Sequence, residues 1–153
     1  MLARKPASTR SPTVNVTSPM RLVFPAMPTV LCIDDRTYGL ACTREMLRAN
    51  GYEVLLAESA HDAADLLQQN PVDAVLLDSR SLGDNCGEVL SVLEELEPDI
   101  PIVMMSGYCS LPCRNLGRAD ACLQKGETSR ALLRTLEIFL CARRYGLLRS
   151  VAA

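Results

Sequence analysis

The sequence predicts an α/β fold in which a five-stranded parallel sheet is doubly wound into a three-layer α/β/α sandwich. Aliphatic runs of five or six residues recur five times, and stretches with helical spacing lie between and after them. Such alternation is typical of βαβ units, whose right-handed crossovers cover both faces of a parallel sheet. A hydrophobic content of 48% supplies the apolar side chains for this core.

The five aliphatic runs are the candidate strands. Each one stops next to a polar residue, as a short strand buried on both faces of a parallel sheet would. We expect strands over residues 29–33, 52–57, 73–78, 101–105 and 120–124.

Four longer stretches have apolar residues at helical spacing. Asn50 and Gly51 are typical of a left-handed helix end, and Pro98 would stop a helix. Ser59 and Thr128 are favoured residues at a helix start. We expect helices over residues 36–49, 60–69, 87–97 and 128–145, with one or two helical turns within residues 109–117.

We expect one folded domain, over residues 28–146. Residues 1–27 contain four prolines and many Ser and Thr but little apolar surface, so a disordered, basic tail is expected there. Their composition resembles a transit peptide, but without its amphipathic helix. Residues 147–153 are expected to be a short C-terminal tail that leaves no room for an output domain.

Charge and cysteine usage exclude several function classes. The first 27 residues carry four basic residues and no acid, which leaves a net charge of −6 on residues 28–153 and argues against direct nucleic-acid binding. No apolar run is long enough to predict a membrane span. Seven Cys without a C-x-x-C pair favour unpaired thiols in a cytoplasmic protein. With His61 as the single His, a His-based metal site or a Ser-His-Asp triad is not expected.

Polar side chains follow four of the expected strands. All carboxyl ends of parallel strands meet at one edge of the sheet, where open α/β sheets bind ligands. The set comprises Asp34 and Asp35 after the first strand, Asp78 at the end of the third, Ser106 after the fourth and Lys125 after the fifth.

Three converging carboxylates repel one another, so a bound cation is expected. Oxygen ligands with room for water suit Mg²⁺. A carboxylate next to Mg²⁺, a hydroxyl and an ammonium together describe a phosphoryl acceptor. Asp78 would attack phosphorus, Mg²⁺ and Lys125 would neutralise the transferred oxygens, and Ser106 would donate a hydrogen bond to one of them.

Each of these residues also has a purely structural interpretation. Asp34 or Asp35 could cap the first helix. Ser106 with Gly107 could form only a turn, and Lys125 could be a solvated loop charge. Their joint occurrence at the ends of four strands favours the functional interpretation.

The residues resemble the receiver domains of two-component response regulators over about residues 28–145. The separations fit as well, at 43 residues from Asp35 to Asp78, 28 to Ser106 and 19 to Lys125. The resemblance implies a flavodoxin-like sheet of strand order 2-1-3-4-5. It also implies that a histidine kinase or a histidine phosphotransfer protein donates a phosphoryl group from a phosphohistidine.

The resemblance implies a role for each acid. Asp78 would be the phosphorylated residue. Mg²⁺ would be held by Asp35, by Asp78 and by the main-chain carbonyl of Arg80, with Asp34 acting through water.

Gly107, Tyr108 and Arg80 would modulate the phosphoryl site around the catalytic residues Asp78, Ser106 and Lys125. Ser106 would be a switch hydroxyl that moves toward the phosphoryl group, and Gly107 would leave space for it to enter. Arg80 and Tyr108 flank the site in receiver-like geometry, and both are bulky enough to obstruct an attacking water. We therefore expect slow hydrolysis of the phosphate on Asp78.

The sequence departs from the family pattern after the fifth strand. Gly126 stands where a Pro usually follows the Lys, so we expect a looser loop. Cys122 stands where the family has a switch aromatic, which puts aromatic coupling to a partner surface in doubt. The fourth helix is shortened by about three residues, judged from the Ser106–Lys125 spacing.

We expect the chain to signal through a downstream protein partner and to catalyse only its own phosphorylation and dephosphorylation. The alternative is a pseudo-receiver, an interaction module that acts without phosphorylation, and the departures at Cys122 and Gly126 favour it. A third class, phosphatases of the haloacid dehalogenase type, has a second acid two residues after the nucleophile. Arg80 occupies that position here, which argues against this class.

Overall fold

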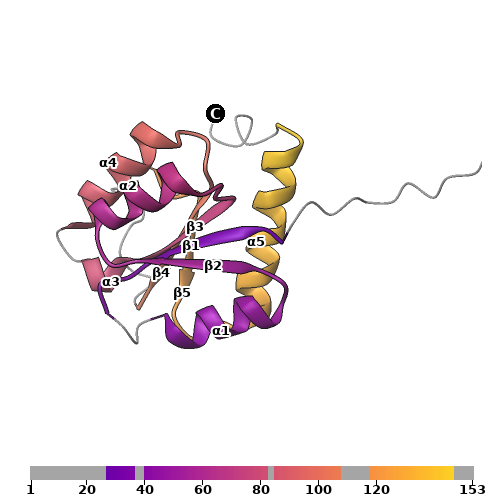
Figure 1. Ribbon diagram of the computed structural model, residues 1–153. Helices are drawn as coiled ribbons and strands as arrows, with labels where there is room; N and C mark the ends of the chain where they lie inside the picture. The colour runs from indigo at the N-terminus through magenta and orange to yellow at the C-terminus, as the bar shows by residue number, and fades with distance from the viewer. Residues whose placement is uncertain (1–26, 37–39, 83–84, 108–117, 147–153) are drawn as a thin grey trace, which may run out of the picture.

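The computed structural model describes residues 27–36, 40–82, 85–107 and 118–146. All strand pairs are parallel, and the strand order is β2-β1-β3-β4-β5, as the sequence predicts (Figure 1). The strands are β1 (Thr29–Ile33), β2 (Glu53–Ala57), β3 (Ala74–Asp78), β4 (Ile102–Ser106) and β5 (Ala121–Gln124), and the helices are α1 (Ala41–Ala49), α2 (Ala60–Gln69), α3 (Ser79–Leu82), α4 (Cys86–Leu96) and α5 (Ser129–Arg144).

Helices cover both faces of the sheet and make a three-layer sandwich. Helices α2 and α4 pack on one face, and α1 and α5 pack on the other (Figure 1). Along β1, Leu31 and Ile33 join the α2/α4 core, whereas Val30 and Cys32 join the α1/α5 core. This alternation follows from the period of two in a strand. Because both sets are buried, β1, β3 and β4 are apolar throughout most of their length.

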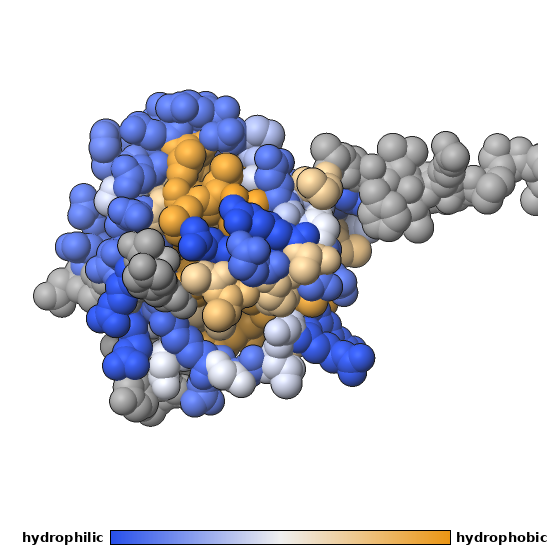
Figure 2. Space-filling model, turned by 60° about the horizontal axis from the view of Figure 1, so that its bottom comes forward, coloured by the Kyte–Doolittle hydropathy of each residue, from blue (hydrophilic) through white to orange (hydrophobic). Residues whose placement is uncertain are grey.

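The two edge strands are less buried than the central ones. Leu55 and Leu56 of β2 are half-buried, and β5 alternates between half-buried and exposed residues. Figure 2, which looks onto the side that carries α1, shows apolar residues in the middle of that face with hydrophilic side chains around them. The central strands therefore supply most of the core.

Two helix boundaries illustrate how local signals act. Helix α2 begins after Ser59, whose hydroxyl accepts a hydrogen bond from the Asp62 amide at 3.1 Å, as expected of a cap. Gly51 after α1 has a φ of +85°, which confirms the left-handed helix end. Helix α1 itself begins at Ala41, not at Arg36 as the spacing predicts, and residues 37–39 lie outside the described part of the chain.

Other differences from the prediction are small. Helix α4 runs one residue earlier than expected. The four-residue helix α3 directly follows Asp78, where no helix is predicted. The helical turns predicted within residues 109–117, most of the predicted tail over residues 1–27 and all of the tail at 147–153 lie outside the described residues.

Two arginines secure the amino edge of the sheet, opposite the carboxyl ends of the strands. The Arg143 guanidinium donates to the main-chain oxygens of Val72 and Asp73 at 2.9 and 3.0 Å. Arg118 donates to the main-chain oxygens of residues 97, 98 and 100. The Asp73 carboxylate accepts a hydrogen bond from the Thr29 amide at 2.8 Å and so ties β1 to the start of β3. Main-chain groups that the strands leave unpaired at this edge are thus satisfied by side chains.

No helix in the described part of the chain is long and apolar enough to cross a membrane. Five of the seven cysteines are described, and none of these five is in a disulfide. Burial raises the pKa of the Cys86 thiol, and it raises the pKa of Cys32 to about 12.

We expect Cys86 to resist alkylation at pH 8, because its thiol is 5% exposed and its raised pKa keeps it protonated. The exposed Cys42 is the internal control and should react rapidly. Folding favours the protonated thiol, so this contribution to stability is complete below about pH 9 and is lost as pH rises through the folded-state pKa. Iodoacetamide labelling with peptide mass mapping measures both rates, and equal rates at the two cysteines would contradict the prediction.

Candidate functional site

The sheet register brings the predicted polar residues to one edge. Ile33 pairs with Leu77, so Asp34 and Asp78 are the next residues on adjacent strands. Ser106 pairs with Gln124, so Lys125 follows directly on the neighbouring strand. The carboxyl ends of β1, β3, β4 and β5 therefore meet as expected.

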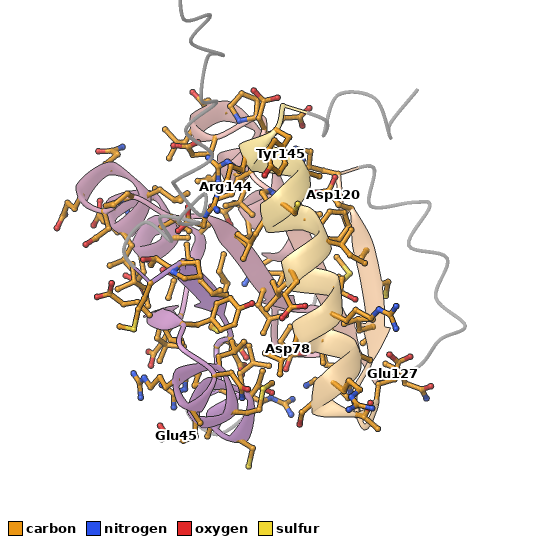
Figure 3. The ribbon with its side chains drawn as sticks, turned by 90° about the vertical axis from the view of Figure 1, so that its right-hand side faces the viewer. Glu45, Asp78, Asp120, Glu127, Arg144 and Tyr145 are labelled. Carbon is orange, nitrogen blue, oxygen red and sulfur yellow. The ribbon has the colours of Figure 1, made fainter. Side chains whose placement is uncertain are left out.

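Asp78 is the centre of this edge. Asp78 is 0% exposed, because it is the last residue of a strand that is buried on both faces. The Lys125 ammonium forms an ion pair with its Oδ2 atom, and the Arg80 amide donates to its Oδ1 atom at 3.0 Å. Figure 3 shows Asp78 toward the same end of α5 as Glu127, which belongs to the loop between β5 and α5. A buried carboxylate is thus compensated by one ammonium and one amide.

Asp34, the residue directly after β1, is also buried and also accepts a hydrogen bond from a main-chain amide. It is 1% exposed, and its Oδ1 atom accepts the amide of Arg36, two residues ahead, at 2.9 Å. Both carboxylates therefore receive the amide two residues on, which is the Asx-turn pattern of an Asp at the end of an element. Asp34 is not a cap of α1, which begins at Ala41.

The structure brings together two of the three predicted carboxylates. Asp35 is exposed, whereas Asp34 and Asp78 are buried. Among the described residues, no group of three or more His, Cys, Asp or Glu side chains is placed to hold a metal ion. Mg²⁺ is commonly held by only one or two carboxylates together with water and phosphate oxygens. The buried Asp34 and Asp78 carboxylates, at the ends of adjacent strands, fit that requirement, and the Asp35 carboxylate and the Arg80 carbonyl as ligands stay predictions.

Strand β4 ends at Ser106, and Gly107 after it lies next to the Arg80 side chain. Ser106 is 3% exposed, and its main-chain oxygen accepts the Lys125 amide at 2.7 Å. A Cβ atom added to Gly107 would lie 2.9 Å from Cδ and 3.2 Å from an Nη atom of Arg80. The Arg80 side chain therefore occupies the space that a larger residue at position 107 would need. Tyr108, the other predicted modulator, lies outside the described residues.

Helix α3 provides a hydrogen bond to β4 that the sequence did not predict. It begins at Ser79, whose hydroxyl donates to the main-chain oxygen of Met105 at 3.1 Å. This bond joins β3 to β4 beside Asp78. A Ser directly after a strand-ending Asp is compatible with many loops, so the sequence carries no specific signal for it.

The loop after Lys125 has a conformation that the usual Pro could not adopt. Gly126 has a φ of +103°, whereas proline is fixed near −65°. The Glu127 amide donates to the main-chain oxygen of Gln124 at 3.0 Å and closes the turn. Cys122, at the position of the family's switch aromatic, is exposed on β5.

A pocket of about 260 Å³ opens beside Lys125. Met46 of α1, Met105 of β4, Leu123 of β5 and Leu132 of α5 contribute its apolar lining. Lys125, whose ammonium pairs with the buried Asp78 carboxylate, thus also lines this pocket.

A 2-1-3-4-5 parallel sheet with a buried Asp–Lys pair at its carboxyl edge defines a receiver-like α/β domain. Residues 30–137 match the family model of the response regulator receiver domain. The chain belongs to that family.

Known proteins agree with this assignment. The chain is 33% identical over 82 residues to the transcriptional regulatory protein ZraR of Salmonella typhimurium, a match that covers 54% of this chain and 19% of ZraR. The chain thus spans about a fifth of that relative.

Two solved structures share the fold. A CheY-like receiver domain protein from Methanospirillum hungatei has a TM-score of 0.69 at 26% identity, with 78% of this chain and 98% of that chain covered. The receiver domain of a sensor histidine kinase from Pseudomonas aeruginosa has a TM-score of 0.67 at 22% identity, with 75% and 98% covered. That structure has a magnesium ion coordinated in its active-site cleft.

We expect Lys125→Met to destabilise the protein by about 1–3 kcal/mol, because it leaves the buried Asp78 carboxylate without its ammonium. In an Asp78→Asn background the same change should cost much less. Urea unfolding of the four proteins without Mg²⁺ gives the coupling energy. Arg130→Met, at an exposed position of α5, is the matched control and should change stability by less than about 0.5 kcal/mol. An equal cost of Lys125→Met in both backgrounds would contradict the prediction.

Proposed function

We propose that the chain is a phosphoacceptor receiver of a two-component system or phosphorelay and takes a phosphoryl group onto Asp78. The observation that carries the proposal is the wholly buried Asp78 carboxylate, paired with the Lys125 ammonium at the carboxyl edge of the sheet. A carboxylate with a purely structural role would not need to be buried at the edge of the sheet where ligands bind. Membership of the receiver family supports the same function.

The proposed step transfers one phosphoryl group. A carboxylate oxygen of Asp78 forms a bond to phosphorus, and the N–P bond of a phosphohistidine breaks. The electron pair of that bond returns to the imidazole nitrogen. The Lys125 ammonium pairs with the carboxylate and would neutralise phosphoryl oxygens, and the Ser106 hydroxyl would donate a hydrogen bond to one of them.

Mg²⁺ would neutralise charge on the transferred oxygens and would be held by Asp35, Asp78 and the Arg80 carbonyl, with Asp34 acting through water. Its support is the buried pair of carboxylates on adjacent strands and the magnesium ion in the receiver domain from Pseudomonas aeruginosa. Turn hydrogen bonds from main-chain amides hold the Asp34 and Asp78 carboxylates in place without the ion.

The phosphoryl donor would be a histidine kinase or a histidine phosphotransfer protein, and the output would pass to a downstream protein. The chain would act as a signalling module and would catalyse only its own phosphorylation and dephosphorylation. The exposed Cys122 and the Gly126 turn favour the second candidate, a pseudo-receiver that binds its partner without phosphorylation.

We expect acetyl phosphate with Mg²⁺ to add one phosphoryl group to the protein, as detected by intact mass. The gain should disappear in Asp78→Asn and in the presence of EDTA, because both remove a required part of the site. Asp120→Asn is a suitable control, since Asp120 lies at the opposite edge before β5. No gain in the parent protein would support the pseudo-receiver instead.

We expect the phosphate on Asp78 to live longer in the parent than in Arg80→Asn or Tyr108→Ala, because bulk at these positions obstructs an attacking water. The Arg80 side chain fills the space beside Gly107, which supports this expectation. A loss of about tenfold in lifetime corresponds to ~1.4 kcal/mol in the hydrolysis barrier.

Loss of the mass increment with time measures the lifetime. Arg144→Asn removes an equal charge at the far end of α5 and should leave the rate unchanged. Decay in the parent as fast as in both variants would refute the role of these side chains.

A further inference from the structure

The amino edge of the sheet carries a second surface feature, a groove of about 1170 Å³. It lies between the start of β1, the loop before β2 and the last turns of α5. Its apolar lining includes Met27, Pro28, Tyr52, Leu133, Leu140 and Tyr145. The groove is therefore larger than the pocket beside Lys125 and differs from it in place and lining.

Two of the lining side chains are far more exposed than is usual for their type. Met27 is 60% exposed and Tyr145 is 65% exposed. Clustered apolar side chains around a groove commonly mark a surface that another segment covers. Figure 3 shows Tyr145 and Arg144 at the end of α5 opposite to Asp78, so this groove is separate from the candidate phosphoryl site.

We propose that residues 20–26 of this chain bind back into the groove, with Leu22, Val23 and Phe24 as the apolar contacts. The described chain begins at Met27 on the groove's own wall, so the segment is tethered directly beside it. These side chains lie three to five positions before Met27 in the sequence, a reach of roughly 10–18 Å. Such a tether gives a high effective concentration, so weak contacts suffice.

Composition and charge distinguish this occupant from other segments. Residues 1–19 include no aromatic residue, and residues 147–153 offer only aliphatic side chains, one arginine and one serine. Residues 20–26 combine Phe24 with two aliphatic neighbours and the basic Arg21. The groove carries Glu137, which is exposed and can meet that arginine. Of the two basic residues in the lining, Arg143 is already occupied by main-chain oxygens and Glu97, and the exposed Arg144 is outnumbered by the acids Asp73, Glu97 and Glu137.

A tryptophan reporter tests the proposal in the full-length chain, which contains no Trp. Phe24→Trp should have a blue-shifted emission maximum relative to the same protein unfolded in urea. Adding Tyr145→Ser, at an exposed position, should shift the emission back toward that of a solvated indole. Emission of a solvated indole in the folded Phe24→Trp protein would overturn the proposal.

Alkylation of Cys141 provides a second readout, because this exposed cysteine lines the groove. The combined variant Leu22→Ser, Val23→Ser and Phe24→Ser should raise its labelling rate several-fold. Val14→Ser with Val16→Ser is the matched control and should leave the rate unchanged, and Cys42 on α1 reports general reactivity. Equal Cys141 rates in all three proteins would contradict the proposal.

The same measurements at several protein concentrations identify the occupant. Protection and blue shift that do not change on dilution support binding within one chain. Signals that vanish on dilution, together with dimer in sedimentation equilibrium, would show that a second copy fills the groove and would overturn the intramolecular proposal. If the double variant Leu147→Ser with Leu148→Ser removes the protection of Cys141, the C-terminal segment fills the groove, which would overturn the proposal.

Discussion

The ion pair between Lys125 and the buried Asp78 carboxylate is the interaction on which the candidate site depends. A sheet covered on both faces leaves its strand ends as the places where a charged group can meet solvent or a ligand. Asp78 is taken wholly out of water there, and such a charge is tolerated only with a partner. Lys125 supplies the partner because β4 and β5 are in register one residue before it. The registers of β3, β4 and β5 therefore bring the two members of this pair together.

Much of this arrangement is readable in the sequence, because aliphatic runs end abruptly at Asp34, Asp78 and Ser106. The two neighbouring acids differ in burial, because Asp34 directly continues the buried strand β1 whereas Asp35 lies in the bend after it, a difference that the sequence alone does not show. The start of α1 was not readable, since helical spacing over residues 36–40 carries no specific stop signal. The carbonyl contacts of Arg118 and Arg143 were not readable either. A single arginine is compatible with any solvated surface, and its partners are chosen by tertiary packing.

Strand β3 connects two edges that differ in chemistry. At its start, Asp73 and Arg143 satisfy main-chain groups and hold β1, β3 and α5 in place. At its end, Asp78 takes part in the candidate chemistry. The strand between them rises roughly 3.3 Å per residue and is rigid and buried throughout. A contact at the amino edge can therefore coexist with phosphoryl chemistry at the carboxyl edge, since the two do not compete for the same side chains.

The positive φ of Gly126 restricts how this chain can diverge from, or return to, the common family sequence. A proline at that position cannot be reached by one tolerated substitution, because the turn would first have to be rebuilt with a negative φ. Almost any other residue would be strained there as well. In this chain, position 126 therefore accepts little besides glycine, and the turn that follows Lys125 ties the conformation of this loop to that one residue.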